Sequence, residues 1–197
     1  MDIEIEKKDE YTNGVNVVAV LGSPRKSGYG SKLLTQVLKE FPKGTNIETY
    51  SAYELNPTTC NACGYCKACD GCSKKDLDDF MKKFINADVI VFAVPNYNMG
   101  LPAPMKALLD RFQRFYEQAK RQKVNSIIPK ERVAILIVTS GSDGEIGFEV
   151  IKHQFLQAFT YLNIELKGTM LARNTNKAGI DSTDMKNAQD LYRSLRR

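Results

Sequence analysis

The 197-residue sequence lacks several features that mark common functional classes. Its longest apolar runs are far shorter than the roughly 20 residues that a membrane-spanning helix needs, so we expect no membrane partner. Basic residues are scattered rather than interleaved with aromatic residues in a stripe, which argues against nucleic-acid binding despite a net charge of +5. The start of the chain, MDIEIEKKDE, is charged, so we expect no signal peptide and a cytoplasmic protein.

Two phosphate-binding motifs and a hydrolase motif are also missing. The sequence contains no Gly-Lys pair, which a P-loop requires, and Gly28 and Gly30 lack the third glycine of a dinucleotide fingerprint. The residue types of a hydrolytic triad occur at Ser140, Asp143 and His153. No nucleophile elbow accompanies them. These absences argue against a P-loop enzyme, a Rossmann-type dehydrogenase and a hydrolase.

The apolar residues that are present predict alternating strands and helices. Continuous apolar runs or short β-branched stretches predict strands over about 15–21, 46–50, 87–94, 132–138 and 164–171. Helical spacing predicts helices over about 30–41, 75–86, 104–119, 147–162 and 182–195, the last capped by Asp181 or Ser182. This alternation predicts an α/β fold, a doubly wound five-stranded parallel sheet with helices on both faces. We expect a charged tail over residues 1–14 and a single domain over residues 15–197.

Three polar loops follow predicted strands, at 22–31, 95–103 and 139–146. Ligands of open α/β sheets bind outside the carboxyl ends of the strands, so we expect these loops to line one crevice. The first loop, with its serines, glycines and cations before a helix, suits the phosphate of a mononucleotide. The other loops add polar groups and, at Tyr97 and Met99, flat or soft surfaces. Together they predict a planar ring system with one phosphate, such as flavin mononucleotide (FMN).

Three segments carry a resemblance to a known family: GSPRKSG at 22–28, ADVIVFAVPNYNMGLPAPMKALLDRF at 87–112 and TSG at 139–141. Over about residues 15–171 the sequence resembles the NADPH-dependent FMN reductase superfamily. The resemblance implies a flavodoxin-like fold and bound FMN. It also implies redox chemistry with electrons from reduced nicotinamide, NAD(P)H, or a ferredoxin, and a homodimer or a dimer of dimers, that is, a homotetramer.

By position, the resemblance assigns the FMN contacts to the three loops. The phosphate contacts fall on Ser23, Arg25, Ser27, Gly30 and Ser31. The contacts to the isoalloxazine ring fall on Pro95, Asn96, Tyr97, Asn98, Met99 and Gly100. The third loop contributes Thr139, Ser140 and Gly141. Tyr29 departs from the family pattern, which often has a small residue there, so the contacts of residues 28–30 stay open.

All five cysteines fall between residues 60 and 72, one at every third position. Iron–sulfur flavoproteins of this superfamily carry C-x2-C-x2-C-x4–7-C in the same place, and the sequence resembles that branch. The resemblance implies a [4Fe–4S] cluster held by Cys60, Cys63, Cys66 and Cys72, with Cys69 spare.

The residues alone leave three interpretations of the cysteine segment open. It holds a [4Fe–4S] cluster, it is a metal-free thiol loop, or it binds structural zinc, although zinc ligands usually come in two separated pairs. Disulfides are disfavoured by the reducing cytoplasm.

The function is open between two classes. One is an FMN-dependent oxidoreductase that transfers electrons to a small-molecule acceptor. The other is a non-catalytic flavin and iron–sulfur electron carrier or redox sensor. Neither requires a side chain that acts as acid or base, because the cofactor carries the chemistry.

Overall fold

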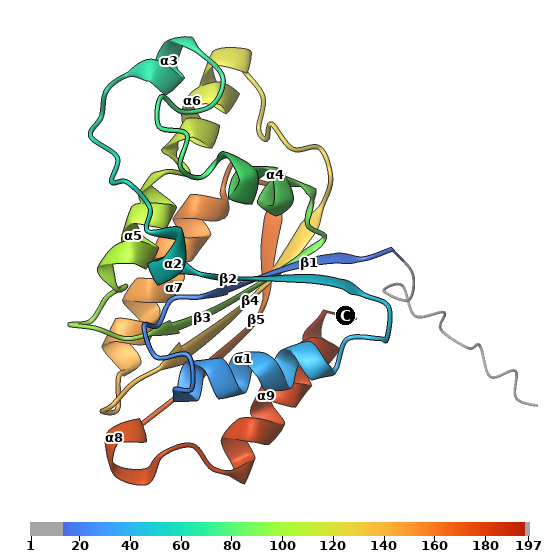
Figure 1. Ribbon diagram of the computed structural model, residues 1–197, viewed down its shortest axis with the longest axis vertical. Coiled ribbons are helices and arrows are strands. Elements are labelled where there is room, and N and C mark those ends of the chain that lie inside the picture. The colour runs from blue at the N-terminus through green and yellow to red at the C-terminus, as the bar shows by residue number, and fades with distance from the viewer. Residues whose placement is uncertain (1–13, 196–197) are drawn as a thin grey trace, which may run out of the picture.

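The computed structural model describes residues 14–195, so the predicted charged tail lies outside the described residues except for Gly14. Five parallel strands form one sheet in the order β2-β1-β3-β4-β5 (Figure 1). They are β1 (Asn16–Leu21), β2 (Asn46–Ser51), β3 (Val89–Pro95), β4 (Arg132–Thr139) and β5 (Ile164–Ala172). The predicted fold class is confirmed. Within the described residues, no helix has the length and apolar character needed to cross a membrane.

Helices form a layer on each face of the sheet (Figure 1). One face is covered by α1 (Tyr29–Lys39) and α9 (Ser182–Ser194). The other is covered by α4 (Asp78–Asn86), α5 (Ala103–Asp110), α6 (Gln113–Gln122) and α7 (Glu145–Phe159). Short helices lie in the connections, namely α2 (Ala52–Leu55), α3 (Tyr65–Ala68) and α8 (Thr175–Ala178).

The strands alternate their side chains between these two layers. In β1, Val18 and Val20 pack into the core under α4 to α7, whereas Val17, Ala19 and Leu21 pack against α1 and α9. All five side chains are buried. A strand buried on both faces needs a continuous apolar run, and this is the pattern by which the sequence predicted β1, β3 and β4.

The cap predicted for the C-terminal helix is confirmed. The Asp181 carboxylate accepts hydrogen bonds from the N–H groups of Thr183 at 2.8 Å and Asp184 at 2.9 Å. Asp184 reaches back to the Asp181 N–H, which completes a capping box.

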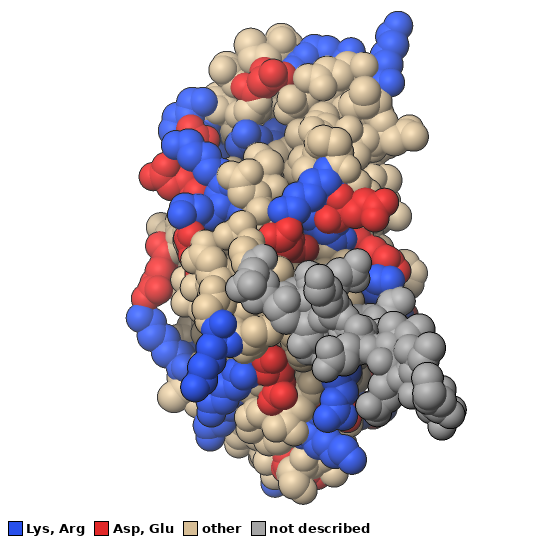
Figure 2. Space-filling model, turned by 90° about the vertical axis from the view of Figure 1, so that its right-hand side faces the viewer, with Lys and Arg blue, Asp and Glu red and all other residues tan. Residues whose placement is uncertain are grey.

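Charged side chains of both signs are interspersed over the face that Figure 2 shows, in keeping with their scatter along the sequence.

Three predicted helix boundaries were wrong. The single helix expected over 104–119 is two helices, α5 and α6, which are separated at Arg111 and Phe112. Pro104 is the second rather than the first residue of α5. The helix expected from Lys75 begins only at Asp78, and Asp76 before it pairs with Arg111. Residues 51–73 and 174–179, for which the sequence predicted no helix, contain α2, α3 and α8.

Candidate functional site

The three predicted loops meet at the carboxyl ends of β1, β3 and β4, on the left of Figure 1. The Gly22 N–H donates to the Ala93 carbonyl at 2.8 Å, and the Asn96 N–H donates to the Thr139 carbonyl at 2.8 Å. A Cβ added at Gly30 would lie 3.9 Å from Thr139 Oγ1, so the start of α1 lies beside the end of β4. The parallel register therefore brings the loops together, as the sequence predicted.

The first loop leads to the N-terminus of α1. Its turn is closed by the Gly28 N–H, which donates to the Arg25 carbonyl at 3.1 Å, and Ser23 Oγ accepts from the Arg25 N–H at 3.2 Å. Gly28 is the N-cap, and no side chain of the described residues caps this end of α1. Its first N–H groups are thus available to an anion, beside the exposed Arg25 and Ser27 and the partly exposed Ser31.

The second loop forms a tight turn after Pro95. Tyr97 and Gly100 exchange both backbone hydrogen bonds at 2.9 Å, with Asn98 at φ 50° and Met99 at φ 60° between them. Left-handed residues other than glycine cost roughly 1 kcal/mol each, and such strain gathers at functional sites. The turn leaves Tyr97 42% and Met99 60% exposed, a large apolar surface at the edge of the crevice.

A cavity of about 490 Å³ opens between the second and third loops. The Asn96 amide lies in it against Gly147, where an added Cβ would stand 2.3 Å from Asn96 Nδ2. Asn96 Nδ2 is 3.5 Å from Ser140 Oγ. Asn96 Oδ1 is buried and has no hydrogen-bond partner among the described residues. An unpaired buried acceptor costs about 1–3 kcal/mol, so this oxygen is suited to accept from a ligand N–H.

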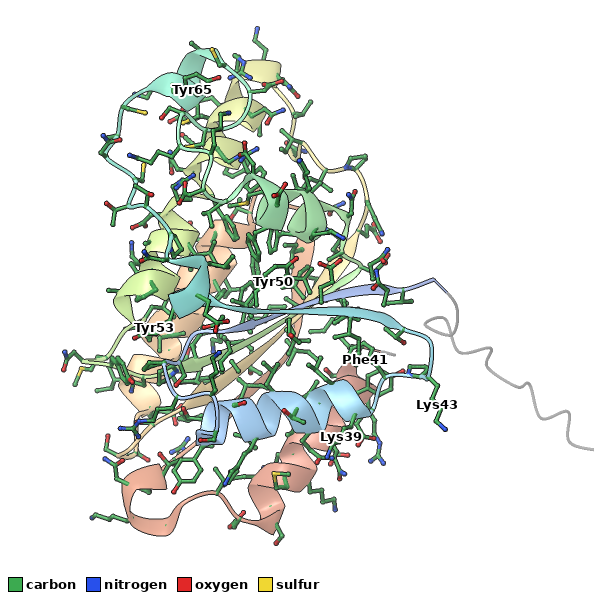
Figure 3. The ribbon with its side chains drawn as sticks, viewed as in Figure 1. Lys39, Phe41, Lys43, Tyr50, Tyr53 and Tyr65 are labelled. Atoms are coloured by element: carbon green, nitrogen blue, oxygen red, sulfur yellow. The ribbon has the colours of Figure 1, made fainter. Side chains whose placement is uncertain are left out.

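The same edge of the sheet holds residues that the sequence did not single out. Tyr53 of α2 lies at the carboxyl end of β2 (Figure 3), and burial, with a smaller effect of Tyr97, raises the pKa of its hydroxyl. Asn176 of α8 follows β5 and packs beside Gly141, where a Cβ would lie 2.3 Å from Asn176 Nδ2. Both residues follow strand ends, so extending the strand-end rule to β2 and β5 would have found them.

The cysteine segment lies away from the three loops, over α6 at the top of Figure 1, where Figure 3 labels Tyr65. Burial raises the pKa of the Cys66 thiol, and Glu117, Cys72 and Cys60 add to the effect because they are near it. Cys60, Cys66 and Cys72 therefore share one neighbourhood.

Cys63 contacts the residue that follows Cys72. Its sulfur is 3.2 Å from Ser73 Oγ, and that hydrogen bond lowers the pKa of its thiol. Within residues 14–195, no set of three or more Cys, His, Asp and Glu side chains is arranged to hold a metal ion. Thiolates are the ligands of iron–sulfur clusters, so the cysteines are donors of the right chemical type. The guanidinium of Arg114 lies near Cys66 and Cys72. The four predicted ligands are thus close in sequence but not assembled as a closed site.

Comparisons with known proteins bear on the family and the fold. The family described as NADPH-dependent FMN reductase matches residues 15–172. An iron–sulfur flavoprotein of Archaeoglobus fulgidus is 34% identical over 99 residues, 49% of this chain and 45% of that protein. An iron–sulfur flavoprotein of Methanosarcina thermophila is 35% identical over 100 residues, 49% of this chain and 52% of that protein. This chain thus spans about half the length of these curated relatives.

Among solved structures, an NAD(P)H:quinone oxidoreductase from Methanothermobacter marburgensis superposes with a TM-score of 0.69 at 17% identity. The superposition covers 93% of this chain and 98% of that chain. At this identity the likeness shows a shared flavodoxin-like fold. The resemblance inferred from the sequence, including the iron–sulfur flavoprotein branch, is confirmed.

Proposed function

This chain belongs to the NADPH-dependent FMN reductase family, and on that basis we propose that it is an FMN-dependent oxidoreductase. The observation that carries the proposal is the crevice where three strand-end loops meet. Between the second and third of these loops lies Asn96 Oδ1, which is buried and has no hydrogen-bond partner among the described residues. FMN would supply the hydride and electron chemistry, whereas the chain binds it, orients it and limits the access of water.

Each loop has a separate part in this binding. The open N-terminus of α1 would hold the phosphate, with Arg25 as counter-charge and hydroxyls from Ser23, Ser27 and Ser31. The turn over 95–100 and the loop over 139–141 would hold the ring system. Asn96 Oδ1 would accept a ring N–H, which removes the cost of its unpaired burial.

Electrons would come from NAD(P)H or a ferredoxin and pass to a small acceptor. The exposed surfaces of Tyr97 and Met99 at the edge of the crevice support a planar acceptor, because such surfaces gain free energy when a flat apolar ring covers them. Steady turnover with a soluble quinone would identify an enzyme. Slow NAD(P)H oxidation with fast exchange to a ferredoxin would identify the electron carrier instead.

We also propose that the cysteine segment holds a [4Fe–4S] cluster, which would supply one-electron transfer. Cys60, Cys63, Cys66 and Cys72 would be the ligands, with Cys69 spare. The iron–sulfur flavoprotein relatives support this proposal, as does the position of Arg114 near Cys66 and Cys72. Replacing Cys69 by Ser is expected to spare the iron, and complete loss of iron would contradict that assignment.

A homodimer or homotetramer in the cytoplasm completes the proposal. A groove of about 1190 Å³ is lined by residues of α5, α6 and α7, and the α7 side chains Ile146, 66% exposed, and Val150, 40% exposed, lie in it. Exposed apolar surface of this kind favours a protein interface. Light scattering after gel filtration measures the assembly directly.

Exposed free cysteines favour a reducing compartment.

The first experiment is an absorption spectrum of anaerobically purified protein, with flavin, iron and sulfide assayed on the same sample. We expect FMN bands, with iron and sulfide in near-equal amounts if the cluster is present. Flavin without iron would leave an FMN reductase with free thiols. Absence of flavin even after FMN is added would contradict the proposed use of the crevice.

A further inference from the structure

Three arginines contact the cysteine loop, which we define as residues 58–76. They lie in the segment that runs from α5 through α6, which we call the helical arm. Arg111 follows α5, and Arg114 and Arg121 lie in α6. Arg114 and Arg121 are seven residues, or about two turns, apart in α6 and so lie on one side of that helix, and α3 of the loop packs against α6. The arm therefore contacts the loop at its base, its middle and its tip.

Arg111 closes the base of the cysteine loop. The residue is 2% exposed, and its Nη1 donates to the Thr58 carbonyl at 2.9 Å and to Asp76 Oδ1 at 2.9 Å. Its Nη2 donates to the Lys74 carbonyl at 2.8 Å. The Thr58 N–H also donates to Asp76 Oδ2 at 2.8 Å. One buried guanidinium thus holds both ends of the loop.

Arg121 holds the tip of the loop through its backbone. Its Nη1 donates to the Cys66 carbonyl at 3.0 Å and to the Cys69 carbonyl at 3.4 Å, and its Nη2 bonds to the Asp70 carboxylate. Cys66 lies in α3 and Cys69 is its C-cap, so the cation lies at the carbonyl end of that short helix. Such a position favours positive charge.

Arg114 lies between base and tip and makes a different kind of contact. Its side chain is 15% exposed, and Asp78 is its ion-pair partner at 3.9 Å. Its Nη2 would lie 3.6 Å from a Cβ added at Gly71, so the guanidinium lies under the turn before Cys72. Its Nε is buried and without a partner among the described residues. A largely buried cation therefore lies beside the turn into Cys72, with Asp78 as its ion-pair partner.

We propose that Arg114 is a further positioning residue of the cysteine loop, a largely buried cation that holds the turn into Cys72 and would offset the negative charge of iron-bound thiolates there. The iron part of this inference rests on the proposed function. Arg111 and Arg121 hydrogen-bond to the loop at either end. Arg114, whose Nε is unpartnered among the described residues like that of Arg111, lies beside the turn that leads into Cys72. Lysine would keep the charge but lose the planar fork, so it should restore the function only in part.

The test compares Arg114→Met and Arg114→Lys with Lys67→Met, which removes the same charge from an exposed position in the same loop. Each protein is reconstituted anaerobically with ferrous iron and sulfide, and iron, sulfide and FMN are assayed. We expect Arg114→Met to lose most of its iron per FMN, with a more negative midpoint potential for the iron that remains. Arg114→Lys should recover part of the iron, and Lys67→Met should match the unchanged protein.

A second measurement needs no iron. Hydrogen exchange of loop peptides in the reduced, metal-free proteins should be about tenfold faster in Arg114→Met, with FMN content unchanged as the check of folding. The proposal would be overturned if Arg114→Met retained as much iron per FMN as the unchanged protein and its loop peptides exchanged no faster. Equal iron loss in Lys67→Met would also overturn it, since net charge would then suffice. If the unchanged protein binds FMN but no iron, the cluster proposal fails. The role of Arg114 is then tested by hydrogen exchange alone, and loop exchange in Arg114→Met as slow as in the unchanged protein would overturn it.

Discussion

The crevice at the strand ends and the cysteine loop are built in opposite ways. The crevice is assembled by backbone hydrogen bonds between strand ends, such as those from Gly22 N–H and Asn96 N–H. The cysteine loop is attached by arginine side chains, with Arg111 at its base and Arg121 at its tip. A site set by strand register tolerates most side-chain changes but not added volume. A site set by a few charged side chains depends on each of them.

This difference predicts separate local stabilities. The central strands β1, β3 and β4, which carry the crevice, are almost entirely buried, whereas all five cysteines of the loop are exposed or half-buried. Segments with few buried apolar contacts open at lower free energy than the core they join. The loop should therefore open while the crevice stays intact, and each prediction below tests that independence.

The largest effect is expected from Arg111→Met. The variant leaves Asp76, 26% exposed at its side chain, and the Thr58 and Lys74 carbonyls without their buried donor. Breaking such a pair costs about 3 kcal/mol, here in the free energy of opening the loop. Thermolysin cleavage within residues 58–76 should accelerate accordingly, while FMN content stays the same.

The matched control for Arg111 is Lys106→Met on the same helical arm. Lys106 pairs with Asp110 across an exposed i,i+4 position, a contact worth about 0.5 kcal/mol or less. Equal acceleration of cleavage in both variants would show that the base of the loop does not depend on the buried guanidinium.

The next effect in size is expected from Gly22→Val, which changes the crevice alone. A Cβ at Gly22 would lie 2.5 Å from Met105 Cγ and 2.8 Å from Val94 Cγ1, both fully buried. Overpacking of this kind costs about 2 kcal/mol, to be measured by urea unfolding, and FMN affinity should fall with it. Gly30→Ala is the control for stability, because its nearest contact would be 3.9 Å away. Equal destabilisation by both would contradict the argument.

A third prediction separates the stability of the crevice from its affinity for ligand. Asn96→Ala removes a buried oxygen that has no partner among the described residues, so the variant should be at least as stable to urea as the unchanged protein. The dissociation constant of FMN should rise about tenfold, measured by flavin fluorescence titration. Asn46→Ala, at the opposite end of the sheet, should leave FMN affinity unchanged. Unaltered affinity in Asn96→Ala would remove Asn96 from the proposed site.

The crevice was predictable because its determinants are local in sequence. Apolar runs fix the two-sided strands, the alternation with helices makes the sheet parallel, and strand-end loops must then meet. The same logic placed the turn over 95–100 and the loop over 139–141 beside each other. Its only shortfall was that the ends of β2 and β5, which supply Tyr53 and Asn176, were left out.

The attachment of the cysteine loop was not predictable because its determinants are distant in sequence. Arg111 bonds to Asp76, 35 positions away, and to Thr58, 53 positions away, with no periodicity to signal either contact. It also stood in what the apolar spacing presented as one continuous helix over 104–119. Arg111, which makes these bonds to the loop, lies in the break between α5 and α6. The spacing of apolar residues gave no sign of this break.

The smallest effect is a dependence of loop opening on acid pH. Burial alone would raise the pKa of Asp76, but the Thr58 N–H and the Arg111 guanidinium outweigh it and hold that pKa below its usual range. A carboxyl with a depressed pKa stabilises the folded loop above its unfolded pKa of about 3.9, and this contribution disappears as the pH falls through the folded value.

Pepsin cleavage within the loop should therefore rise as the pH falls from about 5 to about 3, before FMN is released, because the bonds that join the crevice loops are between backbone groups that do not titrate. Asp76→Asn keeps the shape but cannot titrate, so its loop should be cleaved faster at pH 5 and show little further change. A loop that opens with the same pH profile in Asp76→Asn would mean that another group holds it. Simultaneous release of FMN would mean that crevice and loop are one cooperative unit after all.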